Sequence, residues 1–180
     1  VLTTEQLAQS TLRKRASRPM VKVCSPVKVN DVPLPIPPYV LGAWLGDGTS
    51  AGGQITGVDE FIFDKVASLG FVVNKPETYL ARTVYGLSSI LREVGVLNNK
   101  HIPDQFLFAS VDQRRELLRG LMDTDGTVNP RGTAYLELKN RVLSDGAMTL
   151  AASLGLKPRQ TTYNRPHGKT YMVSFQAYQD

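Results

Sequence analysis

Leu118–Gly126 reads Leu-Arg-Gly-Leu-Met-Asp-Thr-Asp-Gly, an apolar segment of helical character that ends in an acidic turn. Val40–Gly48 has the same form, Val-Leu-Gly-Ala-Trp-Leu-Gly-Asp-Gly, so that Asp47 aligns with Asp125. The offset of 78 residues is close to half of the 180-residue chain. Two similar segments at this spacing predict that the chain contains a duplicated unit.

The residues around the two acidic turns predict a pair of closely packed helices. Gly42 and Gly46 lie four residues apart on one helix face, and Gly120 and Thr124 occupy the same places in the second segment. Small side chains at this spacing let two helix backbones approach closely. We expect a pseudo-twofold helix interface, with a core made by Leu41, Leu45, Leu121 and Met122.

The two acids at the helix ends point to chemistry beyond packing. A carboxylate at a helix C-terminus is disfavoured by the helix dipole, and two such carboxylates side by side also repel each other. A divalent cation between Asp47 and Asp125 would relieve both costs, and Mg²⁺ is typically held by one or two carboxylates. The alternative is that each Asp-Gly pair only closes its helix with a turn.

The composition is that of an ordinary globular chain with a basic balance. It has 42% hydrophobic and 21% charged residues, and no apolar run near the ~20 residues of a membrane-spanning helix. A net charge of +5 suits a polyanionic partner without proving one. The single Cys24 excludes an internal disulfide and a paired-cysteine metal site. With no signal peptide, we expect a cytoplasmic protein of a prokaryotic-type host.

Common enzyme signatures are missing from the sequence. His101 and His167 are the only histidines, and neither has a zinc-site or His-Asn-His nuclease spacing. There is also no Walker loop and no nucleophile elbow.

Hydrophobic periodicity and turn residues predict the remaining elements. We expect a helix from Thr3, as N-cap, to about Ala16. The motif helices should span Pro38–Asp47 and Val111–Asp125. The other predicted helices lie at about 61–69, 88–96 and 142–154, and the predicted strands at 52–56, 71–73, 79–85, 134–138, 157–163 and 170–175.

A second internal match supports the duplication. Ala67-Ser68-Leu69-Gly70 recurs as Ala152-Ser153-Leu154-Gly155, an offset of 85 residues. Because this offset exceeds the motif offset by seven, we expect an inserted loop around 129–132 in the second half.

The two motif segments resemble the LAGLIDADG signature of homing endonucleases. The second copy matches six of its nine positions, and the first is looser, with Leu45 where the signature has its first Asp, as in intein-borne endonucleases. The resemblance covers about residues 39–176. It implies an α+β fold, a duplicated αββαββα-type arrangement of two pseudo-symmetric halves with a saddle-shaped pair of antiparallel sheets.

The resemblance also divides the chain into three parts. Residues 39–110 would form the first half and 111–180 the second. Residues 1–38 would be a basic, proline-rich N-terminal extension or linker, able to lie along phosphates; the alternative is a solvated arm without contacts. The family members with two motifs imply a monomer.

In the family, the acids at the helix ends cleave double-stranded DNA with metal ions. The resemblance makes Asp47 and Asp125 catalytic, and places Mg²⁺ or Mn²⁺ on these acids with Gly46 and Thr124. Asp123 would be structural. A basic residue near each scissile phosphate would be Lys100, in Asn-Lys-His-Ile-Pro, and Lys169, in His-Gly-Lys-Thr-Tyr, with an ordinary surface lysine as the alternative.

Polar residues on the predicted strands and loops of both halves are candidates for DNA binding, because alternating polar side chains on a saddle-shaped sheet can read bases in the major groove. They are Gln54, Thr56, Arg82, Thr83, Arg131, Lys139, Arg159, Gln160, Thr162 and Arg165.

We therefore expect a site-specific homing endonuclease that makes double-strand breaks, in the form of an intein endonuclease domain, with a replicative helicase as a candidate host. The sequence starts at Val1 and ends at Asp180 without the residues of protein splicing, so no self-splicing is expected from it. Two other classes stay open: a DNA-binding module that has lost cleavage, and an RNA-binding maturase.

Overall fold

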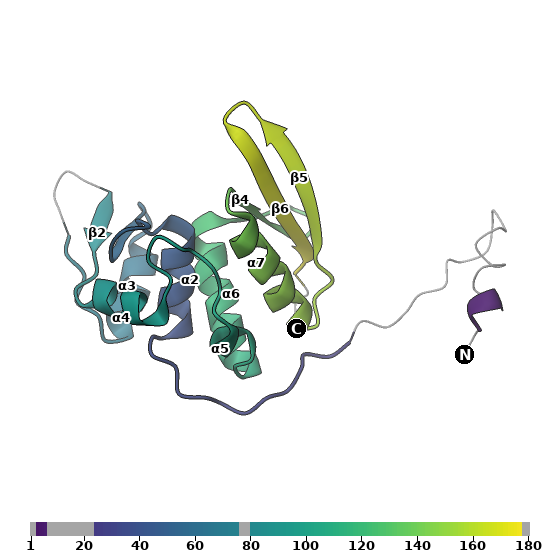
Figure 1. The fold of residues 1–180 in the computed structure, drawn as a ribbon, viewed down its shortest axis with the longest axis horizontal. Helices are drawn as coiled ribbons and strands as arrows, with labels where there is room; N and C mark the ends of the chain where they lie inside the picture. The colour runs from purple at the N-terminus through teal and green to yellow at the C-terminus, as the bar shows by residue number, and fades with distance from the viewer. Residues whose placement is uncertain (1–2, 7–23, 76–79, 178–180) are drawn as a thin grey trace.

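Two long helices lie side by side at the centre of the protein (Figure 1). The computed structural model describes residues 3–6, 24–75 and 80–177. The central helices are α2 (Pro38–Asp47) and α6 (Val111–Asp125), with the bounds predicted for the motif helices. Proline at the first position favours the start of α2, and a capping box of Ser110 and Gln113 starts α6.

Glycine explains how closely these helices pack. A Cβ on Gly42 would collide with the carbonyl oxygen of Leu117, and a Cβ on Gly120 would collide with that of Tyr39. The backbones therefore touch at equivalent places on the two helices. The predicted close helix pair is confirmed.

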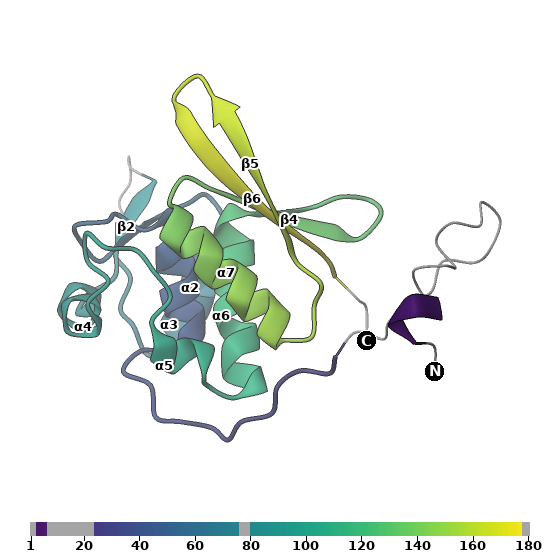
Figure 2. The ribbon, with the colours of Figure 1, turned by 45° about the vertical axis from the view of Figure 1, so that its right-hand side comes forward.

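The second half forms a four-stranded antiparallel sheet on the helices. Its strands are β3 (Gly126–Val128), β4 (Thr133–Leu138), β5 (Arg159–Arg165) and β6 (Gly168–Gln176), in the order β3-β4-β6-β5. α7 (Arg141–Ser153) covers one face together with α6 (Figure 2). Alternate residues of β4, Ala134, Leu136 and Leu138, are buried against these helices.

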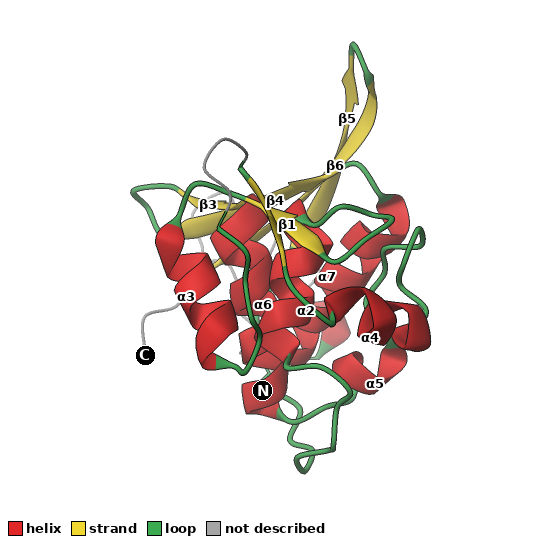
Figure 3. Cartoon of the chain, turned by 90° about the vertical axis from the view of Figure 1, so that its left-hand side faces the viewer, coloured by secondary structure: helices red, strands yellow, loops and turns green. Residues whose placement is uncertain are grey.

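The first half has the same topology with much shorter strands. β1 (Gln54–Thr56), α3 (Glu60–Ser68), β2 (Ala81–Thr83) and α4 (Leu87–Val94) follow α2 in that order. β1 pairs with β2, while isolated bridges join Gly48 to Ile55 and Val73 to Val84. The resulting order, Gly48-β1-β2-Val73, is that of β3-β4-β6-β5. Figure 3 shows the strands of both halves in one layer over the helices.

The duplication can now be aligned through paired residues. Gly48 pairs with Ile55, and its equivalent Gly126 pairs with Leu136, so the offset at these partners is 81. The predicted insertion around 129–132 therefore accounts for three of the seven extra residues. The other four lengthen α7, which has 13 residues against 9 in α3.

The proline-rich strap, residues 24–37, packs on the protein and is not a free linker. The amide side chain of Gln113 pairs with the backbone of Val32, donating to its carbonyl at 2.6 Å and accepting from its N–H at 3.2 Å. The buried guanidinium of Arg114 donates to the carbonyls of Ala109, Ser153 and Val27. The strap thus joins the outer ends of α6 and α7.

Two short elements were not predicted, β3 and the single-turn helix α5 (Asp104–Leu107). At the N-terminus, Thr3 and Gln6 form the predicted capping box, while the rest of the predicted helix to Ala16 lies outside the described residues. Among the described residues, no helix combines the length and the apolar character needed to cross a membrane.

Candidate functional site

Asp47 and Asp125 are the last residues of the two central helices, and the chain enters the sheet layer directly after each of them. A Cβ on Gly46 would lie 3.5 Å from Oδ2 of Asp125 and would collide with the side chain of Thr124. Glycine at position 46 therefore leaves room for the end of α6. The two carboxylates meet at the junction of the helix pair and the sheets.

This environment favours protonation of both acids. Burial and, to a smaller extent, the charge of Asp47 raise the pKa of Asp125 to about 6, while Lys100 acts in the opposite direction. Burial also raises the pKa of Asp47 from its ordinary value, while Lys100 acts in the opposite direction. Two partly buried carboxylates with raised pKa values cost stability, which is typical of a functional site.

Lys100 belongs to this site, as the sequence predicted. Its Nζ donates to the carbonyl oxygens of Leu45 at 3.0 Å and Gly46 at 3.1 Å, at the C-terminal end of α2. It also lies 5.0 Å from the ring centroid of Trp44. Burial lowers the pKa of Lys100, whereas the charges of Asp125 and Asp47 raise it. The ammonium group of Lys100 therefore interacts electrostatically with both carboxylates.

Asn140 was not predicted as a site residue, yet it helps to hold Lys100. The side-chain amide of this N-cap residue of α7 donates to the carbonyl of Lys100 at 2.7 Å, and so ties the lysine loop to the second half. No sequence signal pointed to this contact beyond the N-cap position itself.

The structure does not bring Lys169 to the acids. Lys169 is exposed and pairs with Asn164 next to the turn of the β5–β6 hairpin. Lys100 instead follows α4, so Lys169 is not its counterpart in the duplication. The prediction relied on spacing from the motif and not on the order of elements, and the catalytic role of Lys169 stays a prediction.

The donor set suits a hard divalent cation. Two carboxylates lie together there, and oxygen is the ligand type that Mg²⁺ prefers. The carbonyl of Gly46 accepts from Lys100, and its ligand role stays a prediction. Among the described residues, no three or more His, Cys, Asp or Glu side chains are placed together so that they could hold a metal ion, so a cation would complete its shell with water or phosphate oxygens. The hydroxyl of Thr124 already donates to the carbonyls of Gly120 and Leu121, and the ligand role of Thr124 stays a prediction.

Asp123 has a different environment from Asp47 and Asp125. Its carboxylate accepts a hydrogen bond of 2.8 Å from the hydroxyl of Tyr39, a side chain only 2% exposed. Burial and the neighbouring Asp123 raise the pKa of that phenol. Asp123 thus links α6 to α2, in keeping with the structural role predicted for it.

The sheets present an open face on the side away from the helices. On β1 and β2, register places Gln54, Thr56 and Thr83 on this open face, since Ile55 is buried against the helices. On β5, Arg159 and Arg165 share the open face with Tyr135 and Glu137 of β4, through β6. Arg131, in the β3–β4 turn, and Lys139, after β4, are exposed.

Three predicted DNA-binding residues face the helices instead. Arg82 is opposite Ile55, stacks on Phe63 at 4.0 Å and forms an ion pair with Glu60. Gln160 donates to Ser144 at 2.8 Å and to Asp145 at 2.9 Å on α7, and Thr162 shares its face. The DNA contacts of these three residues stay predictions. Strands alternate sides, and the sequence Arg-Gln-Thr-Thr-Tyr-Asn-Arg is polar throughout, so it did not indicate which residues share the open face.

The alternation of sides along the strands also places on the open face residues that were not predicted to bind DNA. Thr161 and Tyr163 lie on the open face between Arg159 and Arg165. The alternating pattern of β4 could have identified Tyr135 and Glu137, because their neighbours are apolar.

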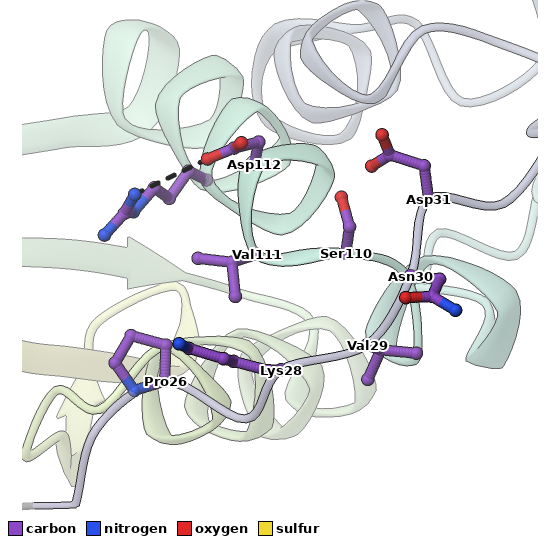
Figure 4. Close-up of a pocket in the computed structure, with 9 residues that line it drawn as sticks. Pro26, Lys28, Val29, Asn30, Asp31, Ser110, Val111 and Asp112 are labelled. Carbon is purple, nitrogen blue, oxygen red and sulfur yellow. Dashed lines mark hydrogen bonds and ion pairs between the residues drawn. The ribbon is translucent and has the colours of Figure 1, made fainter.

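A hollow between the strap and the start of α6 is a separate feature (Figure 4). It is lined by both charges: Lys28 and Arg115 against Asp31 and Asp112, with Arg115 3.5 Å from Asp112. It lies at the opposite end of the 15-residue helix from Asp125, about 20 Å away. It therefore has no part in the acidic site.

Comparison with known proteins agrees with this geometry. The profile of the LAGLIDADG-like domain matches residues 112–174. A replicative DNA helicase DnaB of Mycobacterium intracellulare is 40% identical over 173 residues, covering 94% of this chain and 28% of the helicase. The chain thus spans little more than a quarter of that relative.

Solved structures of the homing endonuclease I-DmoI have a similar fold. Its mesophilic variants match with a TM-score of 0.52 at 16% identity, over 79% of this chain and 88% of theirs. I-DmoI in complex with DNA and Mn matches with a TM-score of 0.54 at 14% identity, over 79% and 89%. The motif helices, the duplicated topology and these matches together show that the chain has the fold of the LAGLIDADG homing endonucleases, with a LAGLIDADG-like domain in its second half.

Proposed function

We propose that this chain is a site-specific DNA endonuclease that cuts both strands of a long target with Mg²⁺ or Mn²⁺. The observation that carries the proposal is the convergence of Asp47, Asp125 and Lys100 at the ends of two packed helices, beside two open sheet faces. An interface that served only for packing would gain nothing from two partly buried acids.

Each group has a role that its position supports. Asp47 and Asp125 would hold the cation with the carbonyl of Gly46, and a bound cation supplies an activated water and stabilises the leaving oxygen. The ammonium of Lys100 would offset the charge that develops on the phosphate. I-DmoI has been crystallised with DNA and Ca, and with DNA and Mn, which supports divalent metal use and duplex DNA as the partner here.

We also propose that the chain is the endonuclease domain of an intein and that the host protein of this intein is a replicative helicase. The match to DnaB supports this, since the chain is similar to 28% of a much longer replicative helicase. A monomer in a prokaryotic cytoplasm remains part of this proposal.

The test is cleavage of a pooled genomic and randomised duplex library, with Mg²⁺, with Mn²⁺ and with Ca²⁺. We expect cuts at one sequence, and a loss of about 10²–10³-fold in rate for Asp47→Asn or Asp125→Asn. Asp123→Asn is the matched control, because this third acid of the same helix end points to Tyr39. Equal rates for all three variants would refute the assigned site.

Binding to the same duplex library, compared with binding to folded RNA, separates the two alternative functions. Selective duplex binding without cuts, unchanged by either catalytic Asn substitution, would indicate a decayed binding module. Preference for a folded RNA over every duplex would indicate a maturase.

A further inference from the structure

The two halves carry equivalent β-hairpins of different length. In the first half, the N–H of Asn74 donates to the carbonyl of Thr83 at 2.9 Å. Ile55 and Leu136 are equivalent, so their partners in the sheets, Arg82 and Val173, are equivalent too. The next residue is Thr83 in the first half and Ser174 in the second, and Ser174 pairs with Arg159 as Thr83 pairs with Asn74. Eight residues separate the first pair in sequence and fourteen separate the second, so the second connection has six more residues, enough for three in each arm of β5–β6.

The extra length projects beyond the helices. Figures 1 and 2 show the β5–β6 hairpin reaching past α7. Antiparallel strands rise about 3.4 Å per residue, so three residues add about 10 Å of reach. Successive base pairs of duplex DNA are also about 3.4 Å apart, so this reach corresponds to about three base pairs.

The open faces of the two hairpins also differ in chemistry. In the first half, the described residues of β1 and β2 on this face are Gln54, Thr56, Ala81 and Thr83, none of them charged. In the second half, β4 and β5 add charged and aromatic residues, namely Glu137, Arg159, Tyr163 and Arg165. Base edges are read by such side chains, with arginine the commonest partner of guanine.

Arg165 is held in place near the end of this hairpin. Its Nε and Nη2 donate to Oε1 of Glu137 at 3.0 and 2.8 Å, and Glu137 also accepts from the hydroxyl of Thr170 at 2.6 Å. The guanidinium lies 5.1 Å from the ring centroid of Tyr163. A guanidinium fixed in this way loses little freedom when it contacts a base.

We infer that recognition is asymmetric: the second half reads about three more base pairs than the first, through the open face of the β5–β6 hairpin. This inference rests on the proposed function and specifies how its target is divided. Tyr163 and Arg165 are the residues that determine specificity at the outer positions of the longer side.

The first experiment maps the target without cleavage. The Asp47→Asn, Asp125→Asn double variant is used to select duplexes from a randomised library, and every position of the selected site is then substituted in turn. We expect sensitive positions to extend about three base pairs further from the centre on one side. Equal extents on both sides would overturn the inference and leave the proposed function intact, whereas no selected sequence at all would overturn both.

The second experiment assigns the longer side to the hairpin. Tyr163→Ala and Arg165→Ala should each reduce discrimination at the outermost positions of the longer side about tenfold, with the other half-site unchanged. Asn164→Ala is the matched control, because it lies between them on the opposite face of the same strand. An equal effect of Asn164→Ala, or a loss spread over both half-sites, would overturn the assignment.

Discussion

The two halves have the same central helix end and the same strand order, and they differ in the lengths of their strands and in the start of the central helix. α2 and α6 touch through equivalent glycines and end in equivalent acids. In contrast, strands of three residues in the first half correspond to strands of six to nine residues in β4, β5 and β6. Chemistry at the shared centre needs fixed geometry, whereas each sheet can follow its own part of a target.

The helices differ at their starts, and this difference explains the strap. α6 has 15 residues and α2 has 10. The first turn of α6 corresponds to residues 33–37, where Pro33, Pro35 and Pro37 prevent a helix. The first half therefore enters as an extended strap, and Gln113 and Arg114 in the first turn of α6 bind it.

The sharpest way to break the comparison is to exchange the motif position at which one half has a leucine, Leu45, and the other an acid, Asp123. Leu45→Asp should destabilise the protein by more than about 4 kcal/mol, because Leu45 is 1% exposed and the new carboxylate would have no partner. Asp123→Leu should cost only about 1–2 kcal/mol, the loss of an acceptor for Tyr39. Urea unfolding measures both. Similar costs would mean that the two positions are interchangeable.

Substitution of the paired glycines tests the part that the halves share. Gly42→Ala and Gly120→Ala should each cost about 3 kcal/mol, because either Cβ meets the backbone of the partner helix. Gly52→Ala is the control, since a Cβ there has no atom within 4 Å, and it should change stability by less than about 0.5 kcal/mol. The comparison fails if only one of the two paired glycines is sensitive in thermal unfolding.

The sequence predicted best what local patterns determine. The bounds of α2 and α6 agree with prediction because glycine, proline and capping residues mark their ends, and β4 was predicted to within one residue because Thr133–Leu138 alternates strictly. Lys100 was placed at the acids through a family motif, and the structure agrees.

The rest depends on contacts that sequence alone does not show. β5 is polar on both faces, so nothing in it indicated that Gln160 turns to α7 and Arg159 away from it. Arg82 resembled any exposed arginine until its pairing with Glu60 was known. The strap looked like a linker because the buried arginine that holds it, Arg114, lies more than eighty residues further along the chain.

The third test concerns the hydrogen bonds of Arg114 to the strap, which have no counterpart in the first half. Arg114→Met should cost about 2 kcal/mol, since it leaves carbonyl oxygens of Ala109, Ser153 and Val27 without their donor. Arg115→Met, whose side chain is 46% exposed, should stay within about 0.5 kcal/mol of the wild type. Hydrogen exchange should show faster opening at Val27 and Val32 in the first variant. Unchanged exchange there would show that the strap holds without the hydrogen bonds of Arg114.

The smallest expected effect is on the pH dependence of folding stability, which compares Asp47 with Asp125. The pKa of Asp125 is about 6 in the folded protein and 3.8 in its ordinary state, so the folded state binds more protons between these values. Ionised Asp125 therefore disfavours the folded state above about pH 6, and the penalty disappears below about pH 4. Asp125→Asn should raise stability at pH 8 by about 1–2 kcal/mol after allowance for solvent screening, and should have little effect at pH 4.

Asp47→Asn should act in the same direction with a smaller gain, because the nearby Lys100 offsets the effect of burial on Asp47. Thermal unfolding with a chelator at pH 4 and pH 8 measures both gains. Addition of Mn²⁺ at pH 8 should then reverse the order: the wild type gains stability because a cation neutralises both carboxylates, and each Asn variant gains less because one ligand is gone. If the Asn variant of one acid is no more stable than the wild type at pH 8 and gains as much stability from Mn²⁺, that acid is not part of the shared centre. The two halves would then differ in their chemistry as well as in their sheets.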